Sequence, residues 1–390
     1  MLDDRIIDIL VERLITRIEN GNTYILEQIG SSIKQIGTLS PSKAQQLANI
    51  LKYGGNYDKI VQKLAEITEL NIKDIQIIFE EVAKENQLFA KQFYDYRNIK
   101  YIPYEKNIAL QNQVNAIAKI TQEQYKNFAN TLAFARKDIN GKIIYTDLSK
   151  TYQNVIDEAV LSVSQGKDTF QNEMYRVIKE LGNSGIKTVD YASGYARRLD
   201  SAVRMNLKGA LRDMSITLQK QFGEEFGADG VEVSHHENSA PDHIDTVDGK
   251  QFSNEEFKKL NSELKRPVGQ LNCYHYIFSI ILGVSKPEYS KEQLKKDKAK
   301  NEKGAILDGK HYTLYEVTQL QRKLETEIRK AKDTQILGKA SGIKENVEES
   351  QLKITELTQK YKEISKISGL PTKLERARVS GYKRININKI

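Results

Sequence analysis

The chain has 390 residues, of which 29 % are charged, and its mean hydropathy is −0.57. One hydrophobic core rarely extends over such a length, so we expect about two to four domains. The sequence contains no run of about 18 apolar residues, which excludes a membrane-spanning helix. The single cysteine excludes an internal disulfide, and the acidic start Met1–Arg5 is unlike a signal peptide.

The net charge of +8 is concentrated in the C-terminal quarter. Residues 291–390 contain 24 lysines and arginines against 14 aspartates and glutamates, a net charge of +10, so the preceding residues have a net charge of −2. Such a basic segment is typical of contact with nucleic acid or with an acidic partner. Because glutamates are interleaved with the basic residues, a solvated helix face is an equally good interpretation.

Residues 1–104 predict an N-terminal helical domain. Apolar residues repeat at helical spacing from Ile7 to Ile18. Ser40–Pro41 indicates a helix start, with an N-cap serine and proline at the first helical position. Gly54–Asn56 interrupts the chain before the next helix, and the tyrosine-rich stretch Tyr94–Tyr104 is predicted to link this domain to the following one.

Residues 105–227 predict a second helical domain with one interruption, where Asp138–Ile144 contains the Asn-Gly pair of a type I′ hairpin turn. The strongest helix prediction covers 194–223, because an apolar stripe runs from Tyr195 to Phe222. Four cations lie off this stripe and are the predicted contacts for a partner or for DNA: Arg197, Arg204, Lys208 and Arg212. The alternative interpretation is that they form a solvated face.

Residues 228–312 predict a small α+β domain inserted between helical segments. Gly230–Ser234 alternates like a half-buried strand, and Asp248–Lys250 has the composition of a turn. The apolar run Tyr274–Leu282 is typical of a central strand. Asp308–Lys310 predicts a further hairpin turn.

This small domain contains four of the five histidines and the only cysteine, all between His235 and His275. Zinc, the candidate cofactor, takes about four nitrogen, sulfur or oxygen ligands. The candidate metal ligands are His236, His243, Cys273 and His275. Their spacing is not that of a zinc finger, and two further interpretations remain open. One is a cysteine nucleophile activated by a histidine, and the other is a structural cluster of a buried thiol and hydrogen-bonded histidines.

Residues 313–390 predict a helical, basic C-terminal tail. Apolar spacing indicates a helix from Leu314 to Ile328. A short heptad seam from Ile354 to Ile364 favours packing onto a neighbouring helix over a long coiled coil. The basic end, Ser380–Arg384, is predicted to be mobile. The fold class is therefore mainly α with a small α+β domain, in a multi-domain helical protein.

A series of short motifs runs in order from about residue 140 to the C-terminus. They are Asp190–Gly194, Asp200–Asn206, Val231–Ser234 with His236, Pro241 and His243, Asn272–Cys273 with His275, Gly283–Ser285 with Pro287, Leu314–Arg322 with Ile328–Lys330, Ser368–Leu370, and Glu375–Val379. In this series the chain resembles the minor capsid (minor head) protein family of tailed bacteriophages. It departs from that family at Ala240 and Tyr274, where arginine is common, and in having no tryptophan.

The resemblance implies a virion structural protein that is not an enzyme. It implies a few copies at the portal vertex or in the capsid interior, with passage through the host cytoplasm during assembly. The implied partners are the portal protein and the major capsid or scaffold protein. Packaged DNA is a further partner, which the basic tail would contact with a strong dependence on salt.

The alternative function is a zinc-dependent hydrolase or nuclease built on His236, His243, Cys273 and His275. Such an enzyme needs an open coordination position and a general base. The sequence offers four nearby acids for that role, namely Glu232, Glu237, Asp242 and Asp245. A host-directed effector is a third class that the sequence leaves open.

Overall fold

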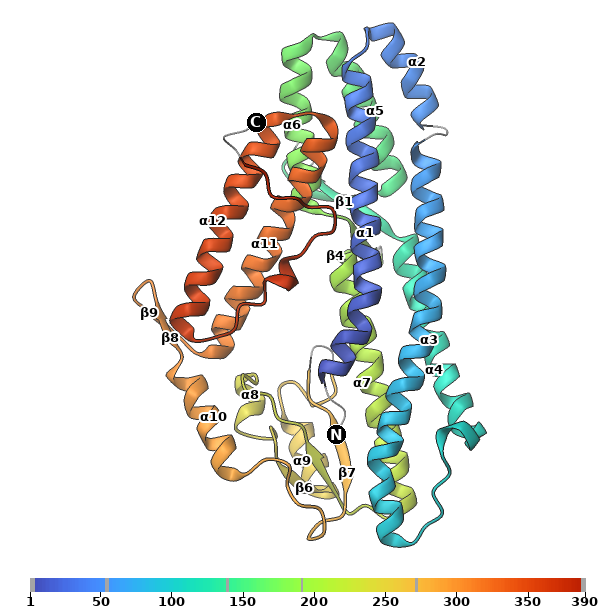
Figure 1. Cartoon of the computed structure of the whole chain (residues 1–390), viewed down its shortest axis with the longest axis vertical. Coiled ribbons are helices and arrows are strands. Elements are labelled where there is room, and N and C mark those ends of the chain that lie inside the picture. Colours follow the sequence, from blue (N-terminus) through green and yellow to red (C-terminus); the bar gives the residue numbers. More distant parts are fainter. Residues whose placement is uncertain (1–3, 53–55, 138–139, 191, 271–272, 387–390) are drawn as a thin grey trace. The chain divides into compact units, whose positions relative to one another are not determined.

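The structure is a computed structural model that describes residues 4–52, 56–137, 140–190, 192–270 and 273–386 (Figure 1). It is mainly α-helical with small antiparallel sheets, as the sequence predicted. The chain forms two compact units, each assembled from separate parts of the sequence. The first unit comprises Met1–Arg13, Ile72–Gln124 and Arg204–Gln319, and the second comprises Leu14–Asn71, Tyr125–Val203 and Leu320–Ile390. The four sequence-predicted domains remain a prediction about which segments fold independently.

The second unit combines long helices with a four-stranded antiparallel sheet. The helices wholly or mostly in it are α1 (Asp4–Gly37), α2 (Pro41–Lys52), α5 (Leu148–Ser164), α6 (Lys167–Ser184), α11 (Leu314–Ser341) and α12 (Lys344–Ser368), with a short 3-10 helix η2 (Leu374–Ala377). The sheet has the order β2-β1-β3-β4, from strands β1 (Leu132–Lys137), β2 (Ile143–Asp147), β3 (Lys187–Asp190) and β4 (Tyr195–Arg198).

This sheet corrects the prediction that residues 105–227 contain a single non-helical interruption. The predicted hairpin is present as β1 and β2, although Asp138 and Ile139 of its turn lie outside the described residues. Two further strands, β3 and β4, extend the sheet. Both are only four residues long, so their alternation was too brief to stand out between helical patterns.

Helices of the second unit approach each other closely at glycines. A Cβ atom at Gly182 on α6 would lie 2.1 Å from the Oγ1 atom of Thr334 on α11. A Cβ atom at Gly30 on α1 would lie 2.6 Å from the Cβ atom of Ala340, also on α11. Because real side chains do not approach so closely, these glycines allow α11 to pack against α1 and α6.

A network of buried charges joins β4 to α11 in the second unit. Arg198 on β4 donates to Asp333 on α11 over 2.7 Å and to Asp200 over 3.3 Å, and Arg329 donates to Asp200. The side chains of Arg198, Asp200 and Asp333 are all less than a tenth exposed. Burial raises the pKa of Asp333, whereas at Asp200 the same burial is outweighed by Arg198 and Arg329, which lower its pKa.

The first unit contains the predicted α+β domain together with helices from both sides of it in sequence. Its helices are α3 (Asn56–Arg97, from Ile72 onward), α4 (Ile108–Asn130, as far as Gln124), α7 (Leu199–Phe226, from Arg204 onward), α8 (Pro241–Ile244), α9 (Asn254–Glu263) and α10 (Lys291–Lys303), with a 3-10 helix η1 (Tyr104–Lys106). Its strands are β5 (Gly230–Val233), β6 (Gln251–Ser253) and β7 (Ile277–Ile280) in the order β6-β5-β7, and the hairpin β8 (Ala305–Leu307) and β9 (Lys310–Tyr312).

Two predictions about this unit hold and one is wrong. The predicted hairpin turn is present at Asp308–Gly309, whose φ angles of 51° and 78° suit a type I′ turn. The predicted apolar stripe is buried from Leu199 to Phe222, but its first residue, Tyr195, lies on β4 and is 53 % exposed. However, β7 is an edge strand and β5 is central. The apolar residues of β7 are buried by helices instead, since the ring of Phe278 lies 5.1 Å from that of Phe89 on α3.

The C-terminal segment is held in place, which corrects the prediction that it is mobile. Thr23 on α1 donates to the carbonyl of Ser380 over 2.6 Å. The Tyr382 hydroxyl and the Ile385 amide both donate to the side chain of Gln351 on α12, over 3.2 and 2.9 Å. These partners lie far away in sequence, so the basic composition of the segment gave no sign of them.

Candidate metal centre

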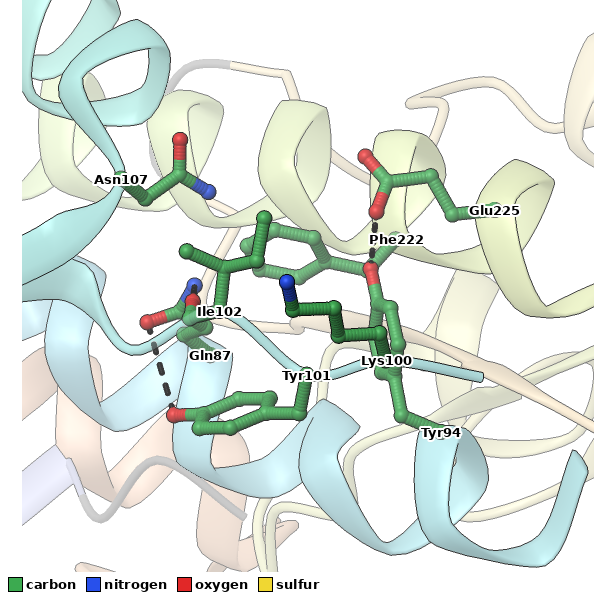
Figure 2. Close-up of a pocket in the computed structure, with 8 residues that line it drawn as sticks. All are labelled: Gln87, Tyr94, Lys100, Tyr101, Ile102, Asn107, Phe222 and Glu225. Carbon is green, nitrogen blue, oxygen red and sulfur yellow. Dashed lines mark hydrogen bonds between the residues drawn. The ribbon is translucent and has the colours of Figure 1, made fainter. Parts of the chain in front are cut away.

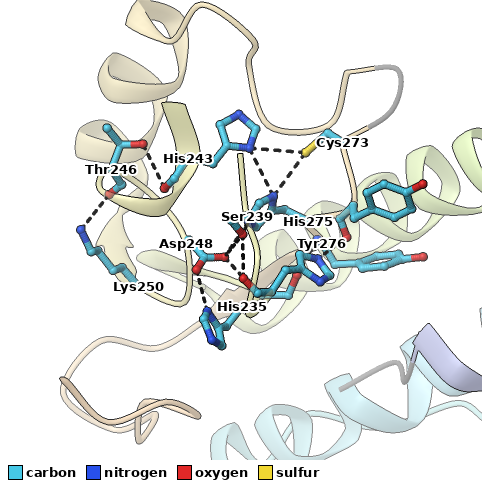
Figure 3. A network of polar contacts seen from close by, with 12 residues as sticks. His235, Ser239, His243, Thr246, Asp248, Lys250, Cys273, His275 and Tyr276 are labelled. Carbon is cyan, nitrogen blue, oxygen red and sulfur yellow. Dashed lines mark hydrogen bonds and ion pairs between the residues drawn. The ribbon is translucent and has the colours of Figure 1, made fainter. Parts of the chain in front are cut away.

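Three of the predicted ligands meet at one point in the first unit (Figure 3). His243 is on α8, which begins at Pro241, and Cys273 and His275 are on the segment that leads into β7. The Nδ1 atoms of the two histidines are 3.3 Å apart. The Cys273 Sγ atom lies 3.5 Å from Nδ1 of His275 and 3.9 Å from Nδ1 of His243.

The hydrogen bonds of the two rings fix which nitrogen faces the centre. Nε2 of His243 lies 2.6 Å from the carbonyl oxygen of Arg266, which only accepts, so this nitrogen carries the proton. Nε2 of His275 donates in the same way to Asp248 over 2.7 Å. In its neutral form, each ring therefore directs the lone pair of Nδ1 towards the other. Two lone pairs at this separation repel each other unless a cation or a proton lies between them.

The distances between these donor atoms fit a tetrahedral metal ion. With Zn–N bonds of about 2.05 Å and Zn–S bonds of about 2.3 Å, the edges of a tetrahedron are about 3.3 Å between nitrogens and about 3.6 Å between nitrogen and sulfur. The observed separations are 3.3, 3.5 and 3.9 Å. Histidines that bind metals also usually donate from their other ring nitrogen to a backbone carbonyl or a carboxylate, as both rings do here. The residues therefore fit a zinc ion.

The charges and hydrogen bonds around Cys273 favour its thiolate form. Burial raises the pKa of Cys273, but hydrogen bonds from His243 and His275 outweigh it and lower the pKa to about 5. Burial lowers the pKa of His275, and its bonds to Asp248 and Cys273 outweigh that effect and raise the pKa to about 9. Near neutral pH the ring therefore carries a proton on Nδ1 as well, and a metal ion would bind by displacing that proton. A thiolate is the form of cysteine that binds metals.

Asp248 organises the loop around the centre. Besides His275, its carboxylate accepts from Ser239 Oγ over 2.8 Å and from the His236 amide over 3.0 Å. The ring of His235 donates to the same carboxylate over 2.6 Å, and its other nitrogen lies 3.2 Å from Asp297 on α10. Sequence reasoning missed this role, because Asp248 had the pattern of an ordinary Asp-Gly turn.

Arg212 on α7 positions the cysteine. Its guanidinium donates to the carbonyl oxygen of Cys273, and the residue is only 4 % exposed. The Cys273 amide in turn donates to the Gln270 carbonyl over 2.9 Å. Asn272, part of the Asn-Cys pair in the sequence motif, lies outside the described residues. In the described structure, Arg212 thus supports the centre from within and is not a surface cation.

His236, the fourth predicted ligand, lies beside the group with a different partner. Its Nε2 donates to the carbonyl of Tyr274 over 2.7 Å. Its ring contacts that of His275 edge-on, with centroids 4.8 Å apart. Burial and the nearby His275 lower the pKa of His236 to about 4. The structure brings together three of the four predicted ligands and places His236 against them.

The four predicted contact cations do not form a single row. Arg197 precedes α7, because residues 195–198 form strand β4, and its guanidinium lies 4.8 Å from the centroid of the Tyr195 ring. Arg204 forms a 2.7 Å ion pair with Glu12. The Lys208 ammonium lies 5.9 Å from the centroid of the Tyr274 ring. The helical prediction for 194–223 placed Arg197 on the same helix as the others, and the actual helix start at Leu199 corrects it.

The acids proposed for a general base all have other partners. Glu232 accepts from Gln251 and from the Glu288 amide, each over 2.8 Å. Asp242 forms an ion pair with Arg266, Asp245 with Lys298, and Glu237 with Lys300. Among the described residues, none of these acids belongs to the group of donors that could hold a metal ion.

A separate cavity of about 50 Å³ lies in the first unit between α3, the segment after it and α7 (Figure 2). Figure 2 shows Tyr94 pointing across it to Glu225, to which its hydroxyl donates. The Gln87 amide donates to the Ile102 carbonyl over 2.8 Å at the same place. A volume of this size holds one or two water molecules and is too small for an organic ligand.

Tyr94 gives the first unit a predictable response to alkali. Burial, followed by its bond to Glu225, raises the pKa of Tyr94 above the ordinary value of about 10. The unfolded chain therefore ionises this tyrosine first, so the free energy of unfolding is expected to fall as pH rises through about 10. Tyr94→Phe should cost about 1 kcal/mol at pH 7 and show a weaker decline between pH 9 and 11 in urea titrations.

The control for this experiment is Tyr96→Phe. Tyr96 is on the same helix but 54 % exposed. Its substitution should leave both the stability at pH 7 and the alkaline decline unchanged. An equal response of the two variants would contradict the assignment of the alkaline effect to Tyr94.

The fold is that of a mainly helical protein in which a small α+β module contains a group of three donor residues that could hold a metal ion. A family model described as Phage minor capsid protein 2 matches residues 2–364, and the chain belongs to this family. The match confirms the resemblance seen in the sequence and extends it over the N-terminal helices, where no motif was recognised. The protein is thus a structural component of bacteriophage virions.

No match was found among curated proteins or among solved structures. None of the helices in the described part of the chain is long and apolar enough to cross a membrane.

Proposed function

We propose that this chain is a low-copy, non-enzymatic component of the phage head, located at the portal vertex or in the capsid interior. It binds the portal protein and the major capsid or scaffold protein, and it contacts packaged DNA after assembly in the host cytoplasm. The observation that carries this proposal is the family match over nearly the whole chain. Long helices with one buried face and one polar face provide rigid surfaces for such contacts.

Two measurements on purified phage test this proposal. Quantitative mass spectrometry of virions should find the chain in far fewer copies than the major capsid protein. Cryo-EM of intact heads, without symmetry imposed at the portal vertex, should find density for it at the vertex or inside the shell. Absence of the polypeptide from purified particles would refute the proposal.

The proposal includes a zinc ion with a structural role, held by His243, Cys273 and His275. It is supported by the hydrogen bonds to the Arg266 carbonyl and Asp248, which direct the Nδ1 atoms of both histidines at the same point as the Cys273 sulfur. When bound, zinc supplies a cross-link between α8 and the segment before β7. These two pieces are joined by a long connection that includes β6 and α9.

A structural zinc ion also explains the site better than a cysteine nucleophile or a zinc-dependent hydrolase. A nucleophilic cysteine needs one activating imidazole, whereas here the Nδ1 atoms of both His243 and His275 lie within 4 Å of the sulfur. A hydrolase needs a general base at the metal, and the acids suggested for this role are bound to Arg266, Lys298 and other partners. The geometry therefore supports a structural ion.

A further inference from the structure

The basic C-terminal quarter of the chain contains a compact lobe in which cations from three segments meet. The second unit contains α11 from residue 320 onward. Its residues 320–326 pack against the end of α12, and Figure 1 shows these two helices side by side. Gln321 donates to Ser365 over 2.8 Å, and Tyr361 donates to Glu325 over 3.0 Å. The chain then folds back, because the Lys373 amide donates to the Tyr361 hydroxyl over 3.1 Å. The lobe is therefore a fixed structure.

Residues 320–326 and 359–376, which we call the basic lobe, contain seven basic and three acidic residues. One of these acids, Glu325, is 6 % exposed and has a raised pKa, chiefly because of burial. Six of the cations are exposed, and none of the six forms an ion pair with another described residue. They are Lys323, Lys360, Lys362, Lys366, Lys373 and Arg376.

The other basic surfaces of the chain are more fully engaged in internal contacts. On α10, Lys298 pairs with Asp245 and Lys300 with Glu237. The α7 cations contact Glu12, the Tyr274 ring and the Cys273 carbonyl. Among the described residues, α10 keeps four exposed lysines without an ion pair, and the basic lobe has six such cations.

We propose that the basic lobe contacts the phosphate backbone of double-stranded DNA. This inference rests on the proposed function, which places the chain next to packaged DNA. Lysine is a point charge that neutralises phosphates without reading bases, so the contact should be independent of sequence and sensitive to salt. The only aromatic residue of the lobe, Tyr361, is fully buried, so bases have no ring to stack on and duplex is favoured over single strands.

The test compares two variants of the full-length protein that lose the same charge. The lobe variant carries Lys360→Gln, Lys362→Gln, Lys366→Gln and Lys373→Gln. The control variant carries four substitutions of exposed lysines on α10: Lys291→Gln, Lys295→Gln, Lys296→Gln and Lys303→Gln. The Kd for a duplex of random sequence is measured by fluorescence anisotropy over a range of salt concentrations.

The wild-type protein should bind duplex with a steep dependence of log Kd on log salt concentration. Each phosphate contact contributes about 0.9 to the magnitude of this slope. The slope should therefore fall by about two to four in the lobe variant and by about one or less in the control variant. Equal slopes for the two variants, or a larger loss in the control, would overturn the inference. So would wild-type protein that binds portal protein but no DNA, which would indicate an acidic protein surface as the partner.

These outcomes are separable from those for the proposed function. The DNA measurements use purified protein, whereas the virion role is tested by the content and density of phage heads. A chain found in heads without duplex binding would refute only the role of the lobe.

Discussion

Purified protein is expected to contain one zinc ion per chain, and Cys273→Ser to lose it together with the folded α+β module. Removal of the thiolate leaves the Nδ1 lone pairs of His243 and His275 facing each other at 3.3 Å without a cation. Loss of a structural metal is among the largest single-site effects, so we expect a loss of stability on the order of 3–5 kcal/mol. Elemental analysis gives the metal content, and thermal unfolding with and without a chelator gives the stability.

The matched control is His236→Ala, which separates a three-ligand from a four-ligand centre. His236 donates to the Tyr274 carbonyl, so its loss should leave the zinc content at one per chain and cost far less stability than Cys273→Ser. Zinc loss in both variants would restore His236 as the fourth ligand. If the wild-type protein contains no metal and Cys273→Ser is as stable as the wild type, the group is a structural polar cluster. A folded Cys273→Ser protein that has lost a catalytic activity would instead support the hydrolase.

The three residues that meet in the candidate metal centre were predictable as a group because histidine and cysteine are so rare in this chain. Their clustering within one short segment indicated the site before any fold was known. The partners that orient them were not predictable, since a backbone carbonyl such as that of Arg266 has no signature in sequence. Asp248 was visible only as part of a turn, and its contact with His275 depends on the fold of the loop.

In the fold, features set by residues close in sequence were predictable, and features set by contacts between distant residues were not. Helices of four or more turns and the two Asn-Gly or Asp-Gly hairpins are set by local patterns, and the structure has them. The start of α7 at Leu199 was missed, because the four residues before it pair with β3, which no helical periodicity reveals. The fixed C-terminal segment depends on Thr23, which is distant in sequence.

The second large effect is expected at Arg198. Arg198→Met leaves Asp333 and Asp200 buried without their shared cation, and removal of one partner from a buried ion network costs about 3–5 kcal/mol. The free energy of unfolding from a urea titration gives the total loss. Hydrogen exchange of the α11 amides around Asp333 should increase in parallel, because the network joins α11 to β4 within the second unit.

Arg176→Met is the matched control, because Arg176 lies in the same unit and pairs with Glu173 and Glu180. Its side chain is 52 % exposed, and exposed ion pairs contribute about 0–1 kcal/mol. If both substitutions cost the same stability, burial is not what makes the Arg198 network important.

A second comparison isolates the penalty of the unpaired charge. The double variant Arg198→Met with Asp333→Leu should be more stable than Arg198→Met alone. In that double variant Asp200 still has Arg329, so no buried carboxylate is left without a cation.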